Sequence, residues 1–407
     1  MTEPPRISEP PRISILVPTW NAAATVERAL ESVLAERDVP LEVVVVDDAS
    51  TDGTADVVAE IATRDPRIVL LTLETNEGVS NARNRGLAAV RGEWLAFLDA
   101  DDRFLPGAIT ALIRPTVDPD VRAVVGQRVH DDGERQWVAR GYDNPDIREP
   151  GRKSIAANPG LMYYAAIHGK LFHRSLIDGL RFEGRVLGDQ PWTISALLRA
   201  GQAIEVVGET VYEWSRPHPD RYVEGITSAT RSSSARAADM ATRATDVFGA
   251  VSAEVDERIG DATTRATVKG AYFDRLIRMD IGPAIGDSLR RRDPATSRLL
   301  DAVASFLASV PAPILAASDP LVHHVVVPPA RRWHDLVPSA RTSYWDVVRV
   351  IYRPGVPLRR HGRWQRIMWP ALLILARSRS PLATAAVSVV IGVLSSVARS
   401  VRRLRRR

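Results

Sequence analysis

Cysteine is absent from this chain of 407 residues. Disulfide bonds and thiolate metal sites are therefore excluded, and nothing in the composition requires an oxidising compartment. The polar, proline-rich start, where EPPRIS occurs twice in tandem, also lacks the apolar segment of a signal peptide, and we interpret residues 1–12 as a disordered lead-in. With 45% hydrophobic and 25% charged residues, the chain as a whole is typical of a globular protein of two or three domains.

Acidic residues are absent after Asp346, although the 61 residues that follow contain 14 arginines. This last part therefore carries a charge of +14 and the preceding part a charge of −9, which together give the formal net charge of +5. An acidic body with a basic tail is informative about binding partners rather than about the fold.

Short apolar runs alternate with helical patterns over the first hundred residues. Because the links between them are short, this order predicts an α/β fold with a doubly wound, mostly parallel sheet. No G-x-G-x-x-G follows the first strand, so a dinucleotide-binding domain of the familiar type is not expected. The predicted strands are 13–17, 42–47, 68–73 and 94–98, and helical patterns lie near 26–34, 57–61 and 78–90.

Polar side chains gather directly after these strands, at the edge where open α/β sheets bind their ligands. Oxygen ligands such as Asp99 and Asp101 suit a hard cation, Mg²⁺ or Mn²⁺, which in turn holds phosphates. Asp48 is a candidate hydrogen-bond acceptor for a base, and Arg83 a candidate positive charge for the same phosphates. The structural alternatives are an acidic turn that caps the next helix and a solvated arginine.

Four segments between residues 13 and 102 carry a resemblance: ISILVPTWN, VVVVDDASTDGT, NEGVSNARNRGL and GEWLAFLDADD. In this order they resemble the family 2 glycosyltransferases with the GT-A fold. The resemblance implies inverting transfer of a sugar from a nucleotide diphosphate, most often UDP, with a divalent metal. Asp48 would then contact the base, Arg83 the pyrophosphate, and Asp99 with Asp101 would form the D-x-D pair, which Asp102 extends. The full set of implied donor-binding residues is Pro18, Thr19, Asn21, Asp48, Arg83, Asp99 and Asp101.

The resemblance also implies a catalytic base. In the family a Glu-Asp pair opens a later helix, and its Asp deprotonates the acceptor hydroxyl; here the pair is Gly188-Asp189. Asp189 is thus the implied base, while a helix N-cap before Pro191 is the structural alternative. The following Gln190-Pro191-Trp192 resembles sugar transferases that decorate wall teichoic acids.

Other features between residues 105 and 228 are less specific. A helix is expected at 105–113, a strand at 121–125, and an acceptor-side mobile loop at about 130–153. Strands at 203–207 and 210–214 would close the domain. His218 is a candidate metal contact, and a surface histidine is the alternative. His168 and Lys170 are candidates for contacts to the acceptor or to phosphate.

The domain organisation that we predict has five parts. They are the lead-in 1–12, a GT-A domain 13–228, a helical domain 229–310, a linker with helices 311–363, and a basic apolar tail 364–407. The tail suits docking on an anionic membrane face, and its uncharged stretch 382–398 is at the short limit for a span. Burial against the helical domain or a second subunit is the alternative, so a homo-oligomer is left open. Nucleic acid is not an expected partner, because no aromatic residues are interleaved in RRLRRR.

The sequence therefore predicts a glycosyltransferase at the inner face of the cell membrane, acting on a cell-envelope or lipid-linked glycan. A non-catalytic GT-A module that tethers through its tail is the alternative, and Gly188 is its main support. Nucleotidyl transfer on a similar sheet is a third reading, but a glycine-rich phosphate loop after the first strand is missing.

Overall fold

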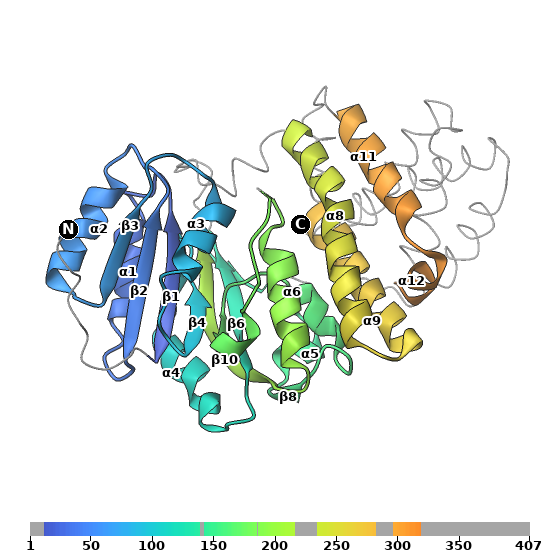
Figure 1. The fold of residues 1–407 in the computed structure, drawn as a ribbon, viewed down its shortest axis with the longest axis horizontal. Helices are drawn as coiled ribbons and strands as arrows, with labels where there is room; N and C mark the ends of the chain where they lie inside the picture. The colour runs from blue at the N-terminus through green and yellow to red at the C-terminus, as the bar shows by residue number, and fades with distance from the viewer. Residues whose placement is uncertain (1–11, 139–141, 185, 216–233, 282–295, 319–407) are drawn as a thin grey trace, which may run out of the picture. The chain divides into compact units, whose positions relative to one another are not determined.

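The structure is a computed structural model that describes residues 12–138, 142–184, 186–215, 234–281 and 296–318 (Figure 1). The described residues form two compact units. The first comprises those up to Ser215 together with 247–269, and the second comprises 234–246, 270–281 and 296–318. The predicted metal contact His218, the tail 364–407 and nearly all of the lead-in lie outside the described residues.

A ten-stranded sheet forms the centre of the first unit, with the main order β3-β2-β1-β4-β9-β6-β10-β5, while β7 pairs with β6 and β8 with β10. Strands β3, β2, β1 and β4 are parallel neighbours, as are β6 and β10. The predicted mostly parallel α/β sheet is thus confirmed. The strands are β1 (Ile13–Thr19), β2 (Leu41–Asp47), β3 (Ile68–Thr72), β4 (Trp94–Phe97), β5 (Arg103–Phe104), β6 (Ala123–Asp131), β7 (Gln136–Trp137), β8 (Gly151–Lys153), β9 (Lys170–His173) and β10 (Ile204–Ser215).

Three local predictions differ from the structure. Strand β9, antiparallel to both β4 and β6, was not expected, because its four residues KLFH include a buried lysine that interrupts the apolar pattern. The two strands predicted at 203–207 and 210–214 are one strand, β10, whose register shifts between Val206 and Thr210. The predicted loop 130–153 contains the end of β6, strands β7 and β8, and the short helix α5 (Pro145–Arg148).

Helices cover both faces of the sheet. Successive side chains of a strand point to opposite faces, so alternate residues of β1 face the helices on opposite sides of the sheet. On one side α1, α2 and α4 contribute to one apolar cluster, and Figure 1 shows α3 and α6 in front of the strands on the other side. The helices are α1 (Val26–Leu34), α2 (Thr54–Arg64), α3 (Val79–Leu87), α4 (Ala108–Ile113) and α6 (Asp189–Ala200), with short turns η1 (Arg114–Val117), η3 (Pro159–Tyr164) and η4 (Arg174–Leu176).

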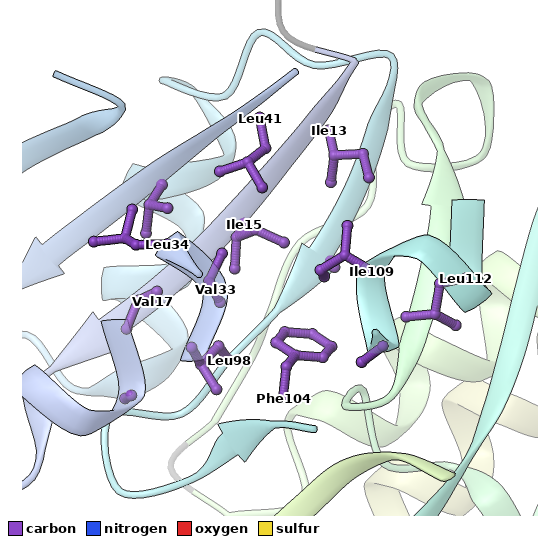
Figure 2. Close-up of a cluster of buried hydrophobic side chains, with 14 of the residues drawn as sticks. Ile13, Ile15, Val17, Val33, Leu34, Leu41, Leu98, Phe104, Ile109 and Leu112 are labelled. Carbon is purple, nitrogen blue, oxygen red and sulfur yellow. The ribbon is translucent and has the colours of Figure 1, made fainter. Parts of the chain in front are cut away.

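The apolar cluster on the first side is shown in Figure 2. It combines every second residue of β1 with the buried stripes of α1 and α4, as their helical spacing predicts. Fully burying a side chain of this size contributes about 1.5–3 kcal/mol before the entropic cost of ordering. The labelled members are Ile13, Ile15, Val17, Val33, Leu34, Leu41, Leu98, Phe104, Ile109 and Leu112.

The opposite side brings α3 and α6 onto the strands that carry the polar residues. A Cβ atom on Gly86 of α3 would lie 2.7 Å from Cδ1 of Leu16, so glycine is what allows α3 to lie directly on β1. Phe97 of β4 packs edge-on against Trp192 of α6 and against Phe182, with ring centroids 5.2 and 5.7 Å apart.

Helices follow the sheet, as the sequence predicts for the residues after 229. They are α8 (Ser234–Arg258), α9 (Ala262–Arg275), η6 (Leu276–Ile281), α11 (Thr296–Ser309) and α12 (Ala312–Ala317). Within the second unit Phe273 packs on Phe306, with ring centroids 5.8 Å apart. In the described part of the chain, no helix has the length and apolar character needed to cross a membrane.

Candidate active site

Three carboxylates converge at the carboxyl end of β4. The chain turns sharply there, because the amide of Asp102 donates a hydrogen bond to the carbonyl oxygen of Asp99 at 3.0 Å. One ligand atom from each of Asp99, Asp101 and Asp102 lies within 4.8 Å of those of the other two. The structure thus brings together the residues of the predicted D-x-D pair and the acid that follows it.

Asp99 is paired on both of its oxygens. Nη2 of Arg83 donates to Oδ1 at 2.8 Å, and Nε2 of His168 lies 3.0 Å from Oδ2. Burial alone would raise the pKa of Asp99, but its interactions with His168 and Arg83 outweigh burial and hold that pKa well below its usual range. Asp99 is therefore an ionised carboxylate.

Asp102 connects this turn to β10. The hydroxyl of Tyr212 donates to its Oδ2 at 2.8 Å, and the amide of Ser215 donates to its Oδ1 at 2.9 Å. Tyr212 also accepts a hydrogen bond from the amide of Asp99 at 3.2 Å. Burial, followed by the like charges of Asp101 and Asp99, raises the pKa of Asp102 well above its ordinary value. Asp102 is best described as the residue that fixes the turn.

Asp101 is the one carboxylate of the three that has no hydrogen-bond partner on another residue in the described part of the chain. Its backbone carbonyl accepts from Nη2 of Arg28 at 2.6 Å, which also donates to Oγ of Ser215 at 2.8 Å. Burial and the nearby charge of Asp99 raise the pKa of the Asp101 carboxyl to about 6. A cation would relieve this repulsion, and converging carboxylate oxygens are the donor set that a hard divalent cation prefers.

The ends of β1 and β2 form a second cluster of polar groups. Oγ1 of Thr19 donates to Oδ1 of Asp47 at 3.1 Å, and Oδ1 of Asn21 accepts from the amide of Thr51 at 2.9 Å. Pro18 lies in β1, in register with Val46 of β2. Asn21 itself has a φ of +49°, a left-handed conformation that costs free energy and is often found at functional sites.

Asp48 follows β2 and binds the two residues that precede α3. Its Oδ1 accepts from the amide of Glu77 at 2.7 Å, and its Oδ2 accepts from the amide of Gly78 at 2.8 Å. The side chain is 2% exposed. Each carboxylate oxygen of Asp48 retains a second lone pair, which could accept a further hydrogen bond. The residue predicted to contact the base therefore also holds the residues before α3.

Asp189 is the first residue of α6, and its side chain is half-buried. Gly188 occupies the N-cap position and Asp189 is the first residue inside the helix, so the alternative that Asp189 is an N-cap is wrong. Within the described residues its carboxylate has no hydrogen-bond partner, which leaves it able to accept a proton. The preceding Leu187 has a φ of +57°, the left-handed region again.

Packing accounts for the glycine that replaces the expected glutamate. A Cβ atom on Gly188 would lie 2.6 Å from the carbonyl oxygen of Glu183 and 2.8 Å from Oγ of Ser80. Both distances are shorter than real Cβ contacts. Residue 188 is therefore glycine because the segment before α6 lies against α3.

Two further candidates have different surroundings. His168 stacks on Tyr212 with ring centroids 5.1 Å apart, beside Asp99, and so belongs to the carboxylate cluster. Lys170 is fully buried in β9, donates from Nζ to the carbonyl oxygen of Ala166 at 2.6 Å, and has Nζ 3.2 Å from the ring centroid of Tyr164. Of the two, His168 is the residue that the structure brings to the site.

Sequence reasoning missed several residues that organise this site. Tyr212 has no local signal, because its partner Asp102 is 110 residues away. Asn84 lies inside the quoted segment NEGVSNARNRGL, and Phe182 lies seven residues before Asp189. Of these three residues, Asn84 is the one that lies in a motif quoted above, so it could have been identified from the sequence.

Part of the chain is similar in sequence to known proteins. Residues 14–180 match the family described as glycosyl transferase family 2. The succinoglycan biosynthesis protein ExoO of Rhizobium meliloti is 46% identical over 110 residues, which cover 27% of this chain and 31% of that protein. The putative teichuronic acid biosynthesis glycosyltransferase TuaG of Bacillus subtilis is 39% identical over 94 residues, covering 23% and 37%. The chain spans about a third to a half of the length of the curated relatives it matches.

The fold also resembles a solved structure. The crystal structure of S. aureus TarS 1–349 in complex with UDP-GlcNAc superimposes with a TM-score of 0.66 at 21% sequence identity, over 86% of this chain and 93% of that one. At this identity the likeness concerns the fold. Taken together, residues 14–180 are similar in sequence to glycosyl transferase family 2, and the chain is similar in fold to TarS.

Proposed function

We propose that this protein is an inverting glycosyltransferase that moves a sugar from a UDP-sugar to a hydroxyl of a cell-envelope or lipid-linked glycan. The observation that carries the proposal is the convergence of Arg83, Asp99 and Asp101 at one end of the sheet. The half-buried Asp189, linked to α3 by contacts of the segment before it, supplies the base.

Each residue has a stated role in this proposal. As the acceptor oxygen attacks the anomeric carbon, its proton passes to Asp189, and the bond from that carbon to the diphosphate breaks. The nucleoside diphosphate leaves with its electron pair, and attack from the opposite side inverts the anomeric centre. Arg83 stabilises the charge on the leaving diphosphate. Asp99 and Asp101 would hold Mn²⁺ or Mg²⁺, which supplies further neutralisation of that charge.

The donor and acceptor classes rest on likeness. The TarS structure holds UDP-GlcNAc, which supports a uridine donor. In this proposal Pro18, Thr19, Asn21 and Asp48 surround the base. ExoO and TuaG take their printed names from succinoglycan and teichuronic acid biosynthesis, which supports a cell-envelope polysaccharide as acceptor.

Donor binding is the first experiment. We would measure thermal shifts with UDP-, GDP- and TDP-sugars, with and without Mn²⁺, for the wild type, Asp101→Ala and the control Asp56→Ala on the exposed face of α2. We expect a metal-dependent shift with UDP-sugars for the wild type and the control, and none for Asp101→Ala. No shift with any nucleotide sugar would contradict the proposal.

Product analysis separates the remaining readings. Slow hydrolysis of the donor by water should release a nucleoside diphosphate, whereas nucleotidyl transfer would release pyrophosphate. A tethering module would release neither. Its main support was Gly188, and the packing of that residue against Ser80 and Glu183 provides a different reason for the glycine.

We also propose that residues 364–407, which lie outside the described residues, bind the inner face of the cell membrane. The support is compositional, since the last 61 residues carry 14 arginines and no acidic residue. Sedimentation with vesicles tests this. The full chain should pellet with vesicles containing anionic lipid and less with neutral ones, and a chain ending at residue 363 should stay in the supernatant. Equal pelleting of the two chains would rule the tail out.

A further inference from the structure

Helix α3 presents one polar face to the rest of the domain. Ser80, Arg83 and Asn84 follow each other at helical spacing, three and four residues apart, and so share that face. Ser80 and Arg83 are buried and Asn84 is half-buried, whereas Asn81 and Arg85 of the same helix are exposed. The inner face therefore has contacts that the outer face lacks.

Asn84 makes a reciprocal pair of hydrogen bonds with one distant residue. Its Nδ2 donates to the carbonyl oxygen of Phe182 at 2.9 Å, and its Oδ1 accepts from the amide of Phe182 at 2.9 Å. An amide side chain that both donates to and accepts from one residue fixes the direction of that backbone as well as its position. Ser80 adds a third hydrogen bond, from Oγ to the carbonyl oxygen of Gly184.

The segment fixed in this way leads directly to Asp189. The ring of Phe182 stacks on Trp192 in the first turn of α6, with centroids 5.0 Å apart and planes 7° apart. At the other end, Gly188 lies so close to Ser80 that an added Cβ would be 2.8 Å from Oγ. The segment 182–188 is thus held to α3 at both ends, and the place where α6 begins follows from it.

The same helix also holds the donor side of the site. Arg83 pairs with Asp99, and its guanidinium carbon lies 5.5 Å from the ring centroid of Phe182. Asp48 holds the residues just before α3 through the amides of Glu77 and Gly78. One rigid element therefore contacts the implied base-binding, phosphate-binding and catalytic regions.

We propose that Asn84 and Ser80 are positioning residues, which hold Asp189 at the correct place relative to the donor. The inference rests on the proposed function, because it assigns the proton transfer to Asp189. Neither residue touches the reacting atoms. Both act through the segment 182–188, and a misplacement of about 1 Å in such a site lowers rates by up to about 100-fold.

The test compares Asn84→Ala with Asn81→Ala in the full chain. Asn81 is the matched control, because it is an exposed asparagine of α3 whose Nδ2 donates to the carbonyl oxygen of Glu77 one turn earlier on the same part of the chain. The readouts are kcat for release of UDP from UDP-GlcNAc with Mn²⁺, and Kd for UDP by calorimetry. We expect Asn84→Ala to lower kcat about 10- to 100-fold with Kd changed less than about twofold, and Asn81→Ala to change neither.

A double variant distinguishes positioning from general structural damage. If Asn84 acts through Asp189, adding Asn84→Ala to Asp189→Asn should lower the residual rate no further, because the two changes remove one effect. If the two losses multiply, or if Kd weakens as much as kcat falls, the positioning role is refuted. If Asn84→Ala fails to fold, Ser80→Ala, which removes one hydroxyl, takes its place in the same experiment. Ser80→Thr, which keeps a hydroxyl, should retain a higher kcat than Ser80→Ala.

The outcomes also distinguish a failure of the positioning role from a failure of the proposed function. A wild-type rate for Asp189→Asn would overturn the assignment of the base, and with it the positioning role. A reduced rate for Asp189→Asn together with a wild-type rate for Asn84→Ala would overturn only the positioning role.

Discussion

Nη2 of Arg83 donates to Oδ1 of Asp99 across 2.8 Å, so the residue assigned to the donor phosphates is paired with a residue assigned to the metal. The two side chains are 7% and 23% exposed, which makes this a largely buried ion pair. Each charge compensates the other. When a diphosphate and a cation bind, Arg83 would pair with the diphosphate and Asp99 with the cation. The buried charges would again be paired, so the net buried charge would change little.

Removing Arg83 should therefore destabilise the protein as well as weaken donor binding. Arg83→Ala leaves the carboxylate of Asp99 without its guanidinium partner, and we expect a loss of about 2–4 kcal/mol in the free energy of unfolding. Urea denaturation measures this. Arg85→Ala on the same helix is the control, since its pair with Glu77 is exposed and should contribute little. Equal stability of Arg83→Ala and wild type would show that the pair is not what holds Asp99.

Asp101 should make stability depend on pH. Its pKa rises from 3.8 to about 6 in the folded protein, so the folded state holds this proton more tightly than the unfolded chain. Its contribution is therefore complete below about pH 4 and is lost as the pH rises through about 6. Without metal, the wild type should lose stability relative to Asp101→Asn between pH 4 and pH 7. Above pH 6, Mn²⁺ should restore stability in the wild type alone, and parallel curves for the two proteins would contradict the assignment.

Restoring the family's glutamate at residue 188 should lower activity. Even Gly188→Ala places a Cβ 2.6 Å from a backbone oxygen of Glu183, and we expect a loss of about 1–3 kcal/mol in stability together with a slower rate. Gly188→Glu should be no better. Gly249→Ala is the control, because its Cβ meets nothing within 4 Å in helix α8, and it should gain about 0.5–1 kcal/mol. An active, stable Gly188→Glu would show that Gly188 is not packed against Glu183 and Ser80 as described.

Replacing the base should affect chemistry rather than binding. Asp189→Asn keeps the size of the side chain but removes its ability to take a proton, so we expect kcat for donor hydrolysis to fall about 10²- to 10⁴-fold. The Kd for UDP, measured by calorimetry, should stay within about twofold because the base acts on the acceptor side. Asp178→Asn, an exposed aspartate in the preceding loop, should behave as wild type.

Much of the sheet was predictable because its signals are local. Strands β1, β2 and β4 are mostly apolar and buried along their whole length. Strand β2 ends at the predicted residue, β4 ends one residue earlier, and β1 extends two residues further. Strand β9 was missed because its burial depends on two distant strands rather than on its own composition. The break predicted near Gly208 was wrong because pairing with β6 carries β10 across a shift in register.

The residues of the site also divide into those with a local sequence signal and those without one. Asp99, Asp101 and Asp48 were found because they directly follow strands, where position alone indicates a function. Asp189 was found only through resemblance, since nothing near it in sequence indicates chemistry. The links between these residues, such as Tyr212 to Asp102 and Asn84 to Phe182, join positions about a hundred residues apart and could not be read from a single sequence.

The attachment of α3 just before its start and along its inner face has an evolutionary consequence. Because Asp48 holds the residues before the helix and Phe182 binds its inner face, a substitution that moves the helix to suit another nucleotide also moves the start of α6. Donor preference and the placement of Asp189 are therefore not free to diverge independently. Among related chains that have exchanged one nucleotide for another, we expect compensating changes at residues 80, 84, 182 and 188, inherited together rather than singly.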